Sequence, residues 1–256
     1  AARTLPADQF AYTYHLHDPV GLPQGHRLDL LRPNDVAQLL ADLRPSAVIH
    51  TVGSNQIDDM TAVITRGTAH VVRESAVHRA RLIHISTDAI FDGKRAPYAE
   101  TAAAAPLNDY GWAKAEAERI VGENYANSVV VRTTLIYGLD EMDNGTTWMA
   151  AALAAGQPVT LFTNQIRNPV WVESLAAACL ELVGLSFTGI LNVAGQQSLS
   201  RADFGLRLLD YWGITDRATL TLVEDHSGRW PLDCRLDLSL AKAVLTTPLP
   251  GVDAVL

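Results

Sequence analysis

Tyr110 and Lys114 are the two residues whose types and spacing point most directly to chemistry. They stand four positions apart in a segment with a helical pattern, so both side chains project from one face of the predicted helix. An ammonium near a phenol favours the phenolate, and we expect it to lower the pKa of Tyr110 below its usual value of roughly 10. Such a tyrosine can donate a proton to a carbonyl oxygen during reduction. The alternative is a surface lysine beside a half-buried tyrosine.

Composition limits the kinds of protein and partner. The chain has 256 residues, of which 48% are hydrophobic and 19% charged, and this predicts an ordinary globular protein. A net charge of −8 disfavours nucleic acid or an anionic membrane as the main partner, so we expect a small-molecule substrate and keep a homodimer as an open alternative. The two cysteines lack metal-ligand spacing, and we predict no metal site. Without a membrane-spanning run or a signal-peptide pattern, the predicted location is cytoplasmic.

Short β-branched runs alternate with helical patterns along the chain. Strands are predicted over 47–52, 81–85 and 128–132, and helices over 33–43, 61–77 and the segment containing Tyr110. We expect the strand over 47–52 to be buried on both faces. Repetition of strand, helix and strand predicts parallel pairing with right-handed crossovers, and hence an α/β fold with a doubly wound, Rossmann-type parallel sheet.

Polar residues follow each of these strands. Gly53-Ser54 follows the first, Ser86-Thr87-Asp88 ends the second, and Thr133-Thr134 ends the third. Any one of these groups could simply begin a turn or cap a helix. Because ligands of doubly wound sheets bind at the carboxyl ends of the strands, their convergence beside the Tyr110 helix predicts a shared ligand crevice.

Four blocks of sequence resemble a known family. They run from His84 to Gly93, from Pro106 to Glu116, from Val131 to Gly138 and from Arg167 to Ala176. As an ordered set they resemble the extended short-chain dehydrogenases/reductases, and among these the dTDP-4-dehydrorhamnose reductase branch. The resemblance covers most of the chain from about Asp29 onward. It is specific for the superfamily and less so for any one substrate.

The resemblance implies an NAD(P)H-dependent enzyme that reduces a keto group on a nucleotide-activated sugar. Tyr110 stands at the position of the proton donor, and Lys114 at that of the lysine that holds the nicotinamide ribose and lowers the pKa of the tyrosine. Thr87 matches the hydroxyl residue that hydrogen-bonds the reacting oxygen. Ser86 is the alternative, since a shift of one residue in a strand reverses which side chain points inward.

The resemblance also implies contacts with cofactor and substrate. Cofactor contacts fall on Asp29, Leu30, Gly53, Ser86, Lys114 and Leu135, and substrate contacts on Ser54, Phe91, Trp148 and Arg167. Asp29 is equally explained as the start of a turn. Arg167 could bind a substrate diphosphate or be an exposed loop arginine, and Trp148 could stack on the substrate or belong to the core. His15-Leu-His17-Asp18 offers basic and acidic groups for the cofactor ribose; of NADP and NAD we favour NADP.

The predicted organisation has two interleaved parts. Residues 1–140 form a dinucleotide-binding domain, and residues 141–256 form mainly a smaller substrate domain, with about 165–195 returning to the first domain. In the second part we expect a helix over 145–156, a strand over 158–161, and a strand over 189–194 that joins the main sheet.

The chain departs from the family pattern at several positions. No strand followed by a Gly-rich turn precedes Phe10, and we expect this first βα unit to precede the sequence given; its loss would instead favour a non-catalytic relative. Ile64 replaces a usual Asn that serves a proton relay, and Leu135 replaces a usual Trp. Gly53-Ser54-Asn55 replaces an Ala-rich strand end. Two alternatives therefore stay open: a sugar-nucleotide epimerase or dehydratase, and a regulatory subunit like the β subunit of methionine adenosyltransferase.

Overall fold

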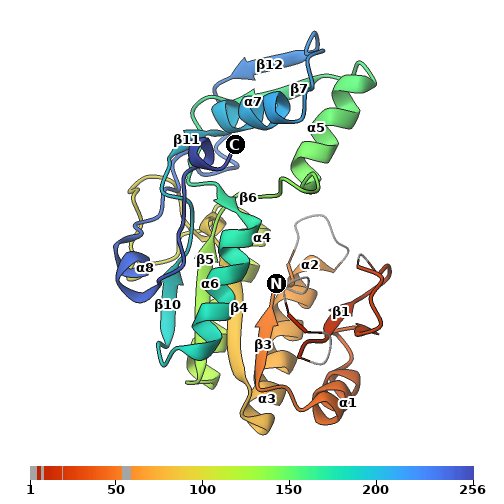
Figure 1. The fold of residues 1–256 in the computed structure, drawn as a ribbon. Coiled ribbons are helices and arrows are strands. Elements are labelled where there is room, and N and C mark those ends of the chain that lie inside the picture. Colours follow the sequence, from red (N-terminus) through yellow and green to blue (C-terminus); the bar gives the residue numbers. More distant parts are fainter. Residues whose placement is uncertain (1–4, 7–8, 19, 54–58) are drawn as a thin grey trace.

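The structure is a computed structural model that describes residues 5–6, 9–18, 20–53 and 59–256 (Figure 1). The predicted substrate contact Ser54 lies outside the described residues. Two groups of elements are visible. A parallel sheet with helices on both faces forms the lower part of the view, and a smaller lobe above it contains α5, α7, β7 and β12.

The main sheet contains four parallel strands in the order β10-β5-β4-β3. The strands are β3 (Ala47–His50), β4 (Arg81–Thr87), β5 (Ser128–Thr133) and β10 (Gly189–Asn192). This arrangement confirms the predicted parallel α/β fold. It also confirms that the strand expected over 189–194 returns to the main sheet, where it pairs with β5.

Helices cover both faces of the sheet. One face packs against α1 (Pro33–Leu43), α3 (Thr68–His78) and α4 (Asp109–Asn124), and the other against α6 (Val172–Gly184) and α8 (Ser239–Val244). Side chains alternate accordingly: Leu82 and Val130 face the first group, whereas Ile83 and Val129 face the second. The buried strands therefore need apolar residues on both sides, which explains their continuous hydrophobic runs.

The helix predicted over 61–77 extends from Met60 to His78 and has an irregular middle. It begins as α2 (Met60–Ala62), widens into the π-helical segment η1 (Val63–Gly67), and continues as α3. A short 3-10 turn, η2 (Asp88–Ile90), follows β4 directly. It turns the chain at the carboxyl edge of the sheet.

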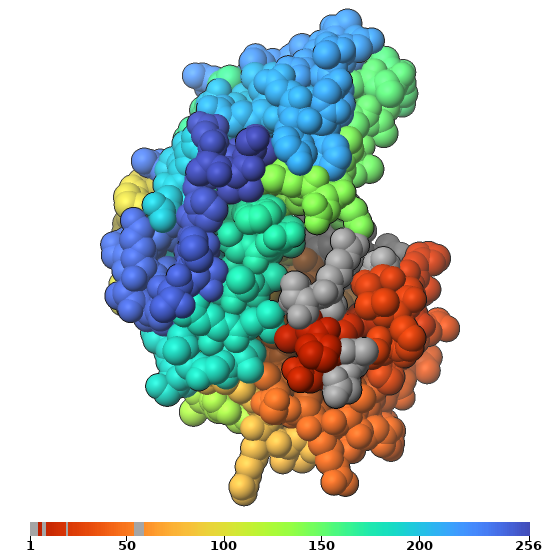
Figure 2. Space-filling model, in the orientation of Figure 1, coloured from red at the N-terminus to blue at the C-terminus, as the bar shows by residue number. Residues whose placement is uncertain are grey.

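The smaller lobe has a core of its own. It contains α5 (Asn144–Ala154), α7 (Arg201–Tyr211), and the parallel pair β7 (Val159–Phe162) and β12 (Leu220–Val223). Apolar side chains of α5, β7 and α7 pack together in this core. Figure 2 shows this lobe above an indentation that separates it from the N-terminal segment. The domain boundaries expected near 140, 165 and 195 remain predictions.

Short strand pairs connect the two parts. β6 (Ile136–Tyr137) pairs with β9 (Val170–Trp171) in parallel, and β8 (Ile166–Arg167) pairs with β11 (Leu199–Ser200) in antiparallel fashion. The 3-10 turn η3 (Val252–Ala254) lies near the end of the chain. The segment around Arg167 therefore belongs to the junction between the two parts.

The strand over 47–52 differs from its prediction. β3 is shorter, and Ala47, Val48 and Ile49 are only half-buried, so the expectation of burial on both faces is wrong. The reason is position: in the described part of the chain, β3 pairs with β4 alone and forms an edge of the sheet. β1 (Tyr12–Tyr14) and β2 (Gly25–Arg27) form a separate parallel pair. The expectation of a preceding Gly-rich turn stays a prediction.

The described residues contain neither a membrane-spanning helix nor a cluster of metal-binding side chains. No helix among them is long and apolar enough to cross a bilayer. Nor does that part of the chain gather three His, Cys, Asp or Glu side chains that could hold a metal ion.

Gly111 allows the start of α4 to approach the turn η2. An ideal Cβ at Gly111 would lie 2.3 Å from the carbonyl oxygen of Ala89 and 2.7 Å from Cβ of Pro106. We expect Gly111→Ala to lower the free energy of unfolding by about 1–3 kcal/mol, because backbone must move to admit the methyl group. Urea denaturation measures the change. The matched control is Gly122→Ala on the same helix, where no heavy atom lies within 4 Å and the helix should gain stability; equal losses in both variants would contradict the close approach.

Candidate active site

Thr87 and Tyr110 face each other at the carboxyl end of β4. Thr87 is the last residue of β4, its Oγ1 accepts a hydrogen bond from the backbone N–H of Ala89 at 3.2 Å, and its side chain lies close enough to Tyr110 to lower the pKa of the phenol. Ser86 points to the opposite face, where its hydroxyl donates to Glu118 at 2.5 Å. Of the two predicted hydroxyl residues, Thr87 therefore lies beside the tyrosine, because consecutive side chains of a strand alternate. A cofactor contact by Ser86 would have to use its backbone.

The pKa of Tyr110 moves opposite to the expected direction. Burial raises the pKa of Tyr110 above its usual value, the hydrogen bond with Thr87 opposes this, and the charge of Asp88 raises it further. The expectation that Lys114 lowers this pKa is therefore wrong for the protein alone. The physical reason is that the Lys114 ammonium donates to the carbonyl oxygen of Ile85 at 2.5 Å.

Lys114 is buried, and not all of its hydrogen-bond donors are used. Its residue is only 3% exposed, and burial lowers its pKa to about 8, against the raising influence of Glu118. An ammonium has three donor positions, of which the Ile85 carbonyl takes one. Gly53 lies next to it with φ +141°, and an ideal Cβ there would be 3.4 Å from Nζ of Lys114. The absence of a side chain at Gly53 leaves the ammonium open to a ligand's hydroxyl groups.

Ile64 occupies the place near Lys114 where the family usually carries an amide. It is fully buried in η1 and packs against Ala113 and Ala117 of α4, with Tyr110 at the margin of the same cluster. An apolar side chain here cannot hydrogen-bond a proton relay. The departure noted in the sequence is thus a packing contact that supports the helix carrying Tyr110 and Lys114.

Asp88 connects the reacting groups with the second part of the chain. One carboxylate oxygen accepts a hydrogen bond from Thr87 at 3.2 Å, and the other accepts from Thr134 at 3.0 Å and pairs with Nε of Arg167 at 2.8 Å. Both side chains of the Asp88 and Arg167 pair are nearly inaccessible to solvent. In a poorly solvated site such a pair must be geometrically well formed to be tolerated.

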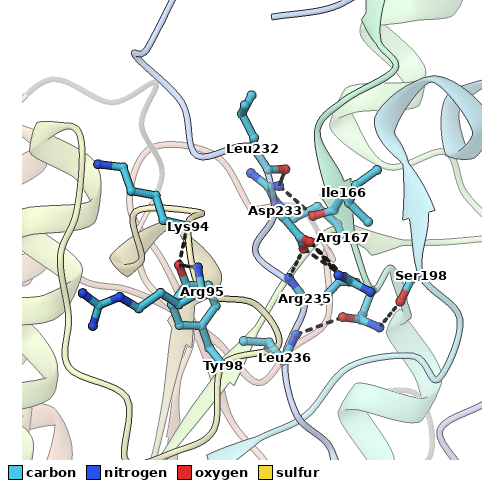
Figure 3. Close-up of polar contacts among 11 residues, drawn as sticks. Lys94, Arg95, Tyr98, Ile166, Arg167, Ser198, Leu232, Asp233, Arg235 and Leu236 are labelled. Carbon is cyan, nitrogen blue, oxygen red and sulfur yellow. Dashed lines mark hydrogen bonds and ion pairs between the residues drawn. The ribbon is translucent and has the colours of Figure 1, made fainter.

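The predicted substrate contact Arg167 is not available to a substrate. It is 6% exposed, and besides Asp88 it donates to the carbonyl oxygens of Ile166, Leu232 and Pro231 at 2.8–2.9 Å. Figure 3 shows this arginine among Ile166, Leu232 and Asp233. The prediction that it binds a diphosphate is therefore wrong, and so is the alternative of an exposed loop arginine. Its role is to tie the 231–233 segment to Asp88.

The prediction for Phe91 is also wrong. Phe91 is fully buried, stacks on Tyr98 with ring centroids 4.1 Å apart, and has the guanidinium carbon of Arg132 5.2 Å from its ring centroid. Because the ring is covered by protein, it cannot contact a substrate. Its sequence position next to η2 could not reveal that the ring turns into the core.

Trp148 and Leu135 remain untested as ligand contacts. Trp148 projects from α5 and is 58% exposed, so the core alternative is wrong and the ring is accessible. Leu135 is half-buried beside the cluster around Tyr137, and its carbonyl oxygen accepts from Val170. Their predicted contacts with substrate and cofactor stay predictions.

Asp29 and Leu30 lie in the loop before α1. Asp29 accepts from the backbone N–H of Leu31 at 2.9 Å, as a turn-starting Asp does, and it also lines a hollow of about 380 Å³. The other residues lining this hollow are His15, Arg27, Arg32 and Asp35. The Leu30 carbonyl is hydrogen-bonded to Nδ1 of His70 at 2.8 Å, and its side chain packs near Gly67. The basic side chains in this hollow are suited to an added phosphate group.

Sequence reasoning gave no role to several residues that shape the site. Asp88 and Thr134 were grouped only as polar strand ends, and the hydrogen bonds that join them depend on η2 turning toward β5. Glu118 holds Ser86 and forms a buried ion pair with Arg132 at 2.8 Å. Glu118 is four residues after Lys114, and this helical spacing was the available signal.

The fold and the site together define a class of protein: Rossmann-type α/β proteins with a Tyr and Lys pair on a helix beside the carboxyl edge of the sheet. The family model described as the RmlD substrate binding domain matches residues 13–250. The chain therefore belongs to this family, and the resemblance to the dTDP-4-dehydrorhamnose reductase branch is confirmed.

Curated relatives include proteins named as reductases and one named as a subunit of methionine adenosyltransferase. The chain is 28% identical to the probable low-salt glycan biosynthesis reductase Agl14 of Haloferax volcanii, over 94% of this chain and 85% of the relative. It is 29% identical to the dTDP-4-keto-6-deoxy-D-glucose reductase of Streptomyces niveus, over 75% of this chain and 69% of the relative. It is 26% identical to the methionine adenosyltransferase 2 subunit beta of Pongo abelii, over 75% of this chain and 62% of that protein's length.

Solved structures share the fold. A hypothetical dTDP-4-dehydrorhamnose reductase from Sulfolobus tokodaii has a TM-score of 0.78 at 26% identity, with 93% of this chain and 88% of that chain covered. The dTDP-4-dehydrorhamnose reductase of Bacillus anthracis, solved in complex with NADP, has a TM-score of 0.78 at 23% identity, with 89% and 84% covered. These similarities confirm the Rossmann-type architecture.

Removing the charge of Asp88 should destabilise the protein. In Asp88→Asn the buried Arg167 loses its counter-ion, and we expect the free energy of unfolding to fall by about 3–5 kcal/mol. Denaturant unfolding followed by circular dichroism measures this loss. The control is Asp210→Asn, which breaks the exposed pair of Asp210 with Arg217 and should cost less than about 1 kcal/mol. Similar losses in the two variants would show that the buried pair contributes no more to stability than the exposed pair.

Proposed function

We propose that this protein is an NAD(P)H-dependent reductase that acts on a keto group of a nucleotide-activated sugar. The observation that carries the proposal is the group formed by Thr87, Tyr110 and Lys114 at the carboxyl edge of the parallel sheet. Threonine and tyrosine hydroxyls that face each other can both hydrogen-bond one carbonyl oxygen. The site residues predicted from the sequence retain these roles in the proposal, except for Phe91 and Arg167.

The raised pKa of Tyr110 suits the role of an acid. Burial raises this pKa above its usual value, so the phenol stays protonated at neutral pH and can donate its proton to the carbonyl oxygen as the keto group becomes an alcohol. The Thr87 hydroxyl lies beside the phenol and would orient the same oxygen. A phenolate has no proton to donate, so the raised pKa of Tyr110 favours reduction of the keto group.

The residues around Lys114 fit a dinucleotide. The free donors of the buried ammonium would bind the ribose hydroxyls at the nicotinamide end of the cofactor, and Gly53 leaves room for the ribose because it has no side chain. A bound reduced nicotinamide supplies the hydride. At the other end, the hollow is lined by the basic His15, Arg27 and Arg32 and by the acidic Asp29 and Asp35, and we favour NADP because an additional phosphate would meet the arginines there. We place the substrate in the part formed mainly by residues 141–256.

The names of the relatives support the reductase proposal and also one alternative, a regulatory subunit. Two of the three relatives are named as reductases, and the name of one of them specifies a dTDP sugar as its substrate. The relative named methionine adenosyltransferase 2 subunit beta favours the regulatory alternative. The buried Lys114 and the Thr87 and Tyr110 contact favour catalysis, since a protein that only binds a partner has no need for a desolvated ammonium beside them.

Tyr110→Phe tests the proposal. We expect turnover of a dTDP-4-keto-6-deoxy sugar with NADPH to fall roughly 100- to 10,000-fold, because the proton donor is gone. NADPH and NADH affinity, measured by fluorescence titration, should be nearly unchanged. The control is Tyr125→Phe, at the end of the same helix, where the hydroxyl bonds the Ala80 carbonyl away from the site and its loss should leave turnover intact. Failure of the wild-type protein to bind either dinucleotide would refute the reductase and favour the regulatory alternative.

Titration of Lys114 should make kcat/KM depend on pH. Its pKa of about 8 in the ligand-free protein means that the ammonium is charged below pH 8 and neutral above it. If the charged form holds the cofactor, kcat/KM should fall above about pH 8, by up to about tenfold per pH unit. Lys114→Arg keeps the charge at high pH and should remove this decline, whereas Lys242→Arg on α8 should keep it. A decline that persists unchanged in Lys114→Arg would assign it to another group.

A further inference from the structure

Two histidines are neighbours inside the main sheet, where β3 pairs with β4 (Figure 1). His50 lies opposite His84 in the register, and their ring centroids are 5.3 Å apart. His84 is fully buried and His50 is 4% exposed. Nε2 of His50 is hydrogen-bonded at 3.1 Å to the hydroxyl of Thr68, which begins α3. His84 shares a side of β4 with Ser86, whose hydroxyl donates to Glu118 of α4. Both rings therefore lie on the face of the sheet that α3 and α4 cover.

The ammonium of Lys114 lies just beyond the two rings. It donates to the carbonyl oxygen of Ile85, the residue after His84. On the side of β3, an ideal Cβ at Gly53, which follows His50 closely in the chain, would be 3.4 Å from Nζ. A positive charge on either ring would thus stand near a second cation. In a poorly solvated interior the two charges would repel each other strongly.

No carboxylate in the part of the chain that the structure describes is hydrogen-bonded to either ring. Both ring nitrogens of His84 lack a partner there, and His50 bonds a hydroxyl. The buried carboxylates of the covering helices, Glu74 and Glu118, are each paired with an arginine. A proton taken up by a ring would therefore add an unbalanced charge. The charged and titratable groups of the elements packed against this face are the buried Glu74, Lys114, Glu118 and Arg132, the half-buried His70 and Tyr110, and the exposed Arg66 of η1.

We propose that the pair of His50 and His84 is an acid-sensitive element of the fold, in which protonation of the rings drives β3 and β4 apart. The rings stay neutral while the sheet is closed and take up protons when it opens. Because β3 leads to Gly53 and β4 ends at Thr87, opening here also takes apart the edge of the sheet where the site lies. This inference concerns the folded sheet and does not depend on the proposed reaction.

Acid should destabilise the folded protein through these two rings. Burial lowers the pKa of His50 to about 3 and that of His84 well below its usual value, and the charge of Lys114 lowers both further. In the unfolded chain both rings titrate near their usual pKa of about 6.5. Below that pH the unfolded chain binds more protons than the folded protein. The contribution to stability is therefore complete above about pH 7 and is lost progressively as the pH falls below about 6.5.

Urea unfolding at pH 7 and at pH 5 tests the pair. Each ring that is protonated only after unfolding should raise the unfolding equilibrium constant roughly 25-fold between these pH values. His84→Leu removes one ring, so its increase should be roughly 25-fold smaller than that of wild type. His50→Gln keeps a polar partner for Thr68 and should show the same reduction. His226→Gln removes an exposed histidine and should keep the full wild-type increase, because all other titrating groups are unchanged.

The outcomes are decided by comparing the variants at the two pH values. Increases in His84→Leu and His50→Gln that equal the wild-type increase would overturn the proposal, as would an equal reduction in His226→Gln. A measurement on the wild type alone covers the case in which either substitution prevents folding. The imidazole NMR signals of His50 and His84 in the folded protein should not titrate between pH 7 and pH 5. Titration of either ring near its usual pKa of about 6.5 would overturn the proposal.

Discussion

The buried ion pair of Asp88 with Arg167 is the contact on which the rest of the site depends. Asp88 lies one residue after Thr87 and accepts from it, while Arg167 donates to the carbonyl oxygens of Pro231 and Leu232 and to that of its neighbour Ile166. A charge pair that excludes water tolerates little change in geometry, since either partner alone would be strongly unfavourable. The pair therefore fixes the turn after β4 against the 231–233 segment. The position of Thr87 relative to Tyr110 follows from that constraint.

Burial shifts the pKa values of two neighbouring groups, Tyr110 and Lys114, in opposite directions. It raises the pKa of the Tyr110 phenol and lowers the pKa of the Lys114 ammonium to about 8, because in both cases it penalises the charged form. The two groups share a helix face without a direct bond between them in the protein alone, as the ammonium is directed to the Ile85 carbonyl. A ligand whose hydroxyls bond the ammonium would complete the link. The site is thus organised for an acid that is protonated at rest.

Much of the fold could be predicted from the hydrophobic pattern of the sequence. The helix over 33–43 has the predicted bounds, and β4, β5 and β10 lie where runs of Val, Ile and Leu predicted strands. These elements follow from local periodicity, which tertiary contacts do not override here. The bounds of β3 and the burial of Ala47, Val48 and Ile49 could not be read in this way. The exposure of a strand depends on which strands pair with it, and the hydrophobic pattern of the strand does not show which strands these are.

By itself, the sequence determined the residue types and the helical spacing that bring Tyr110 and Lys114 to one face, and the family blocks around them. Only the tertiary structure decided that Thr87 and not Ser86 faces the tyrosine, and that Phe91 and Arg167 are buried. The physical reason is that availability to a ligand is a property of what surrounds a side chain. Arg167 is an example, because its guanidinium is occupied by the Asp88 carboxylate and by the carbonyl oxygens of Ile166, Leu232 and Pro231.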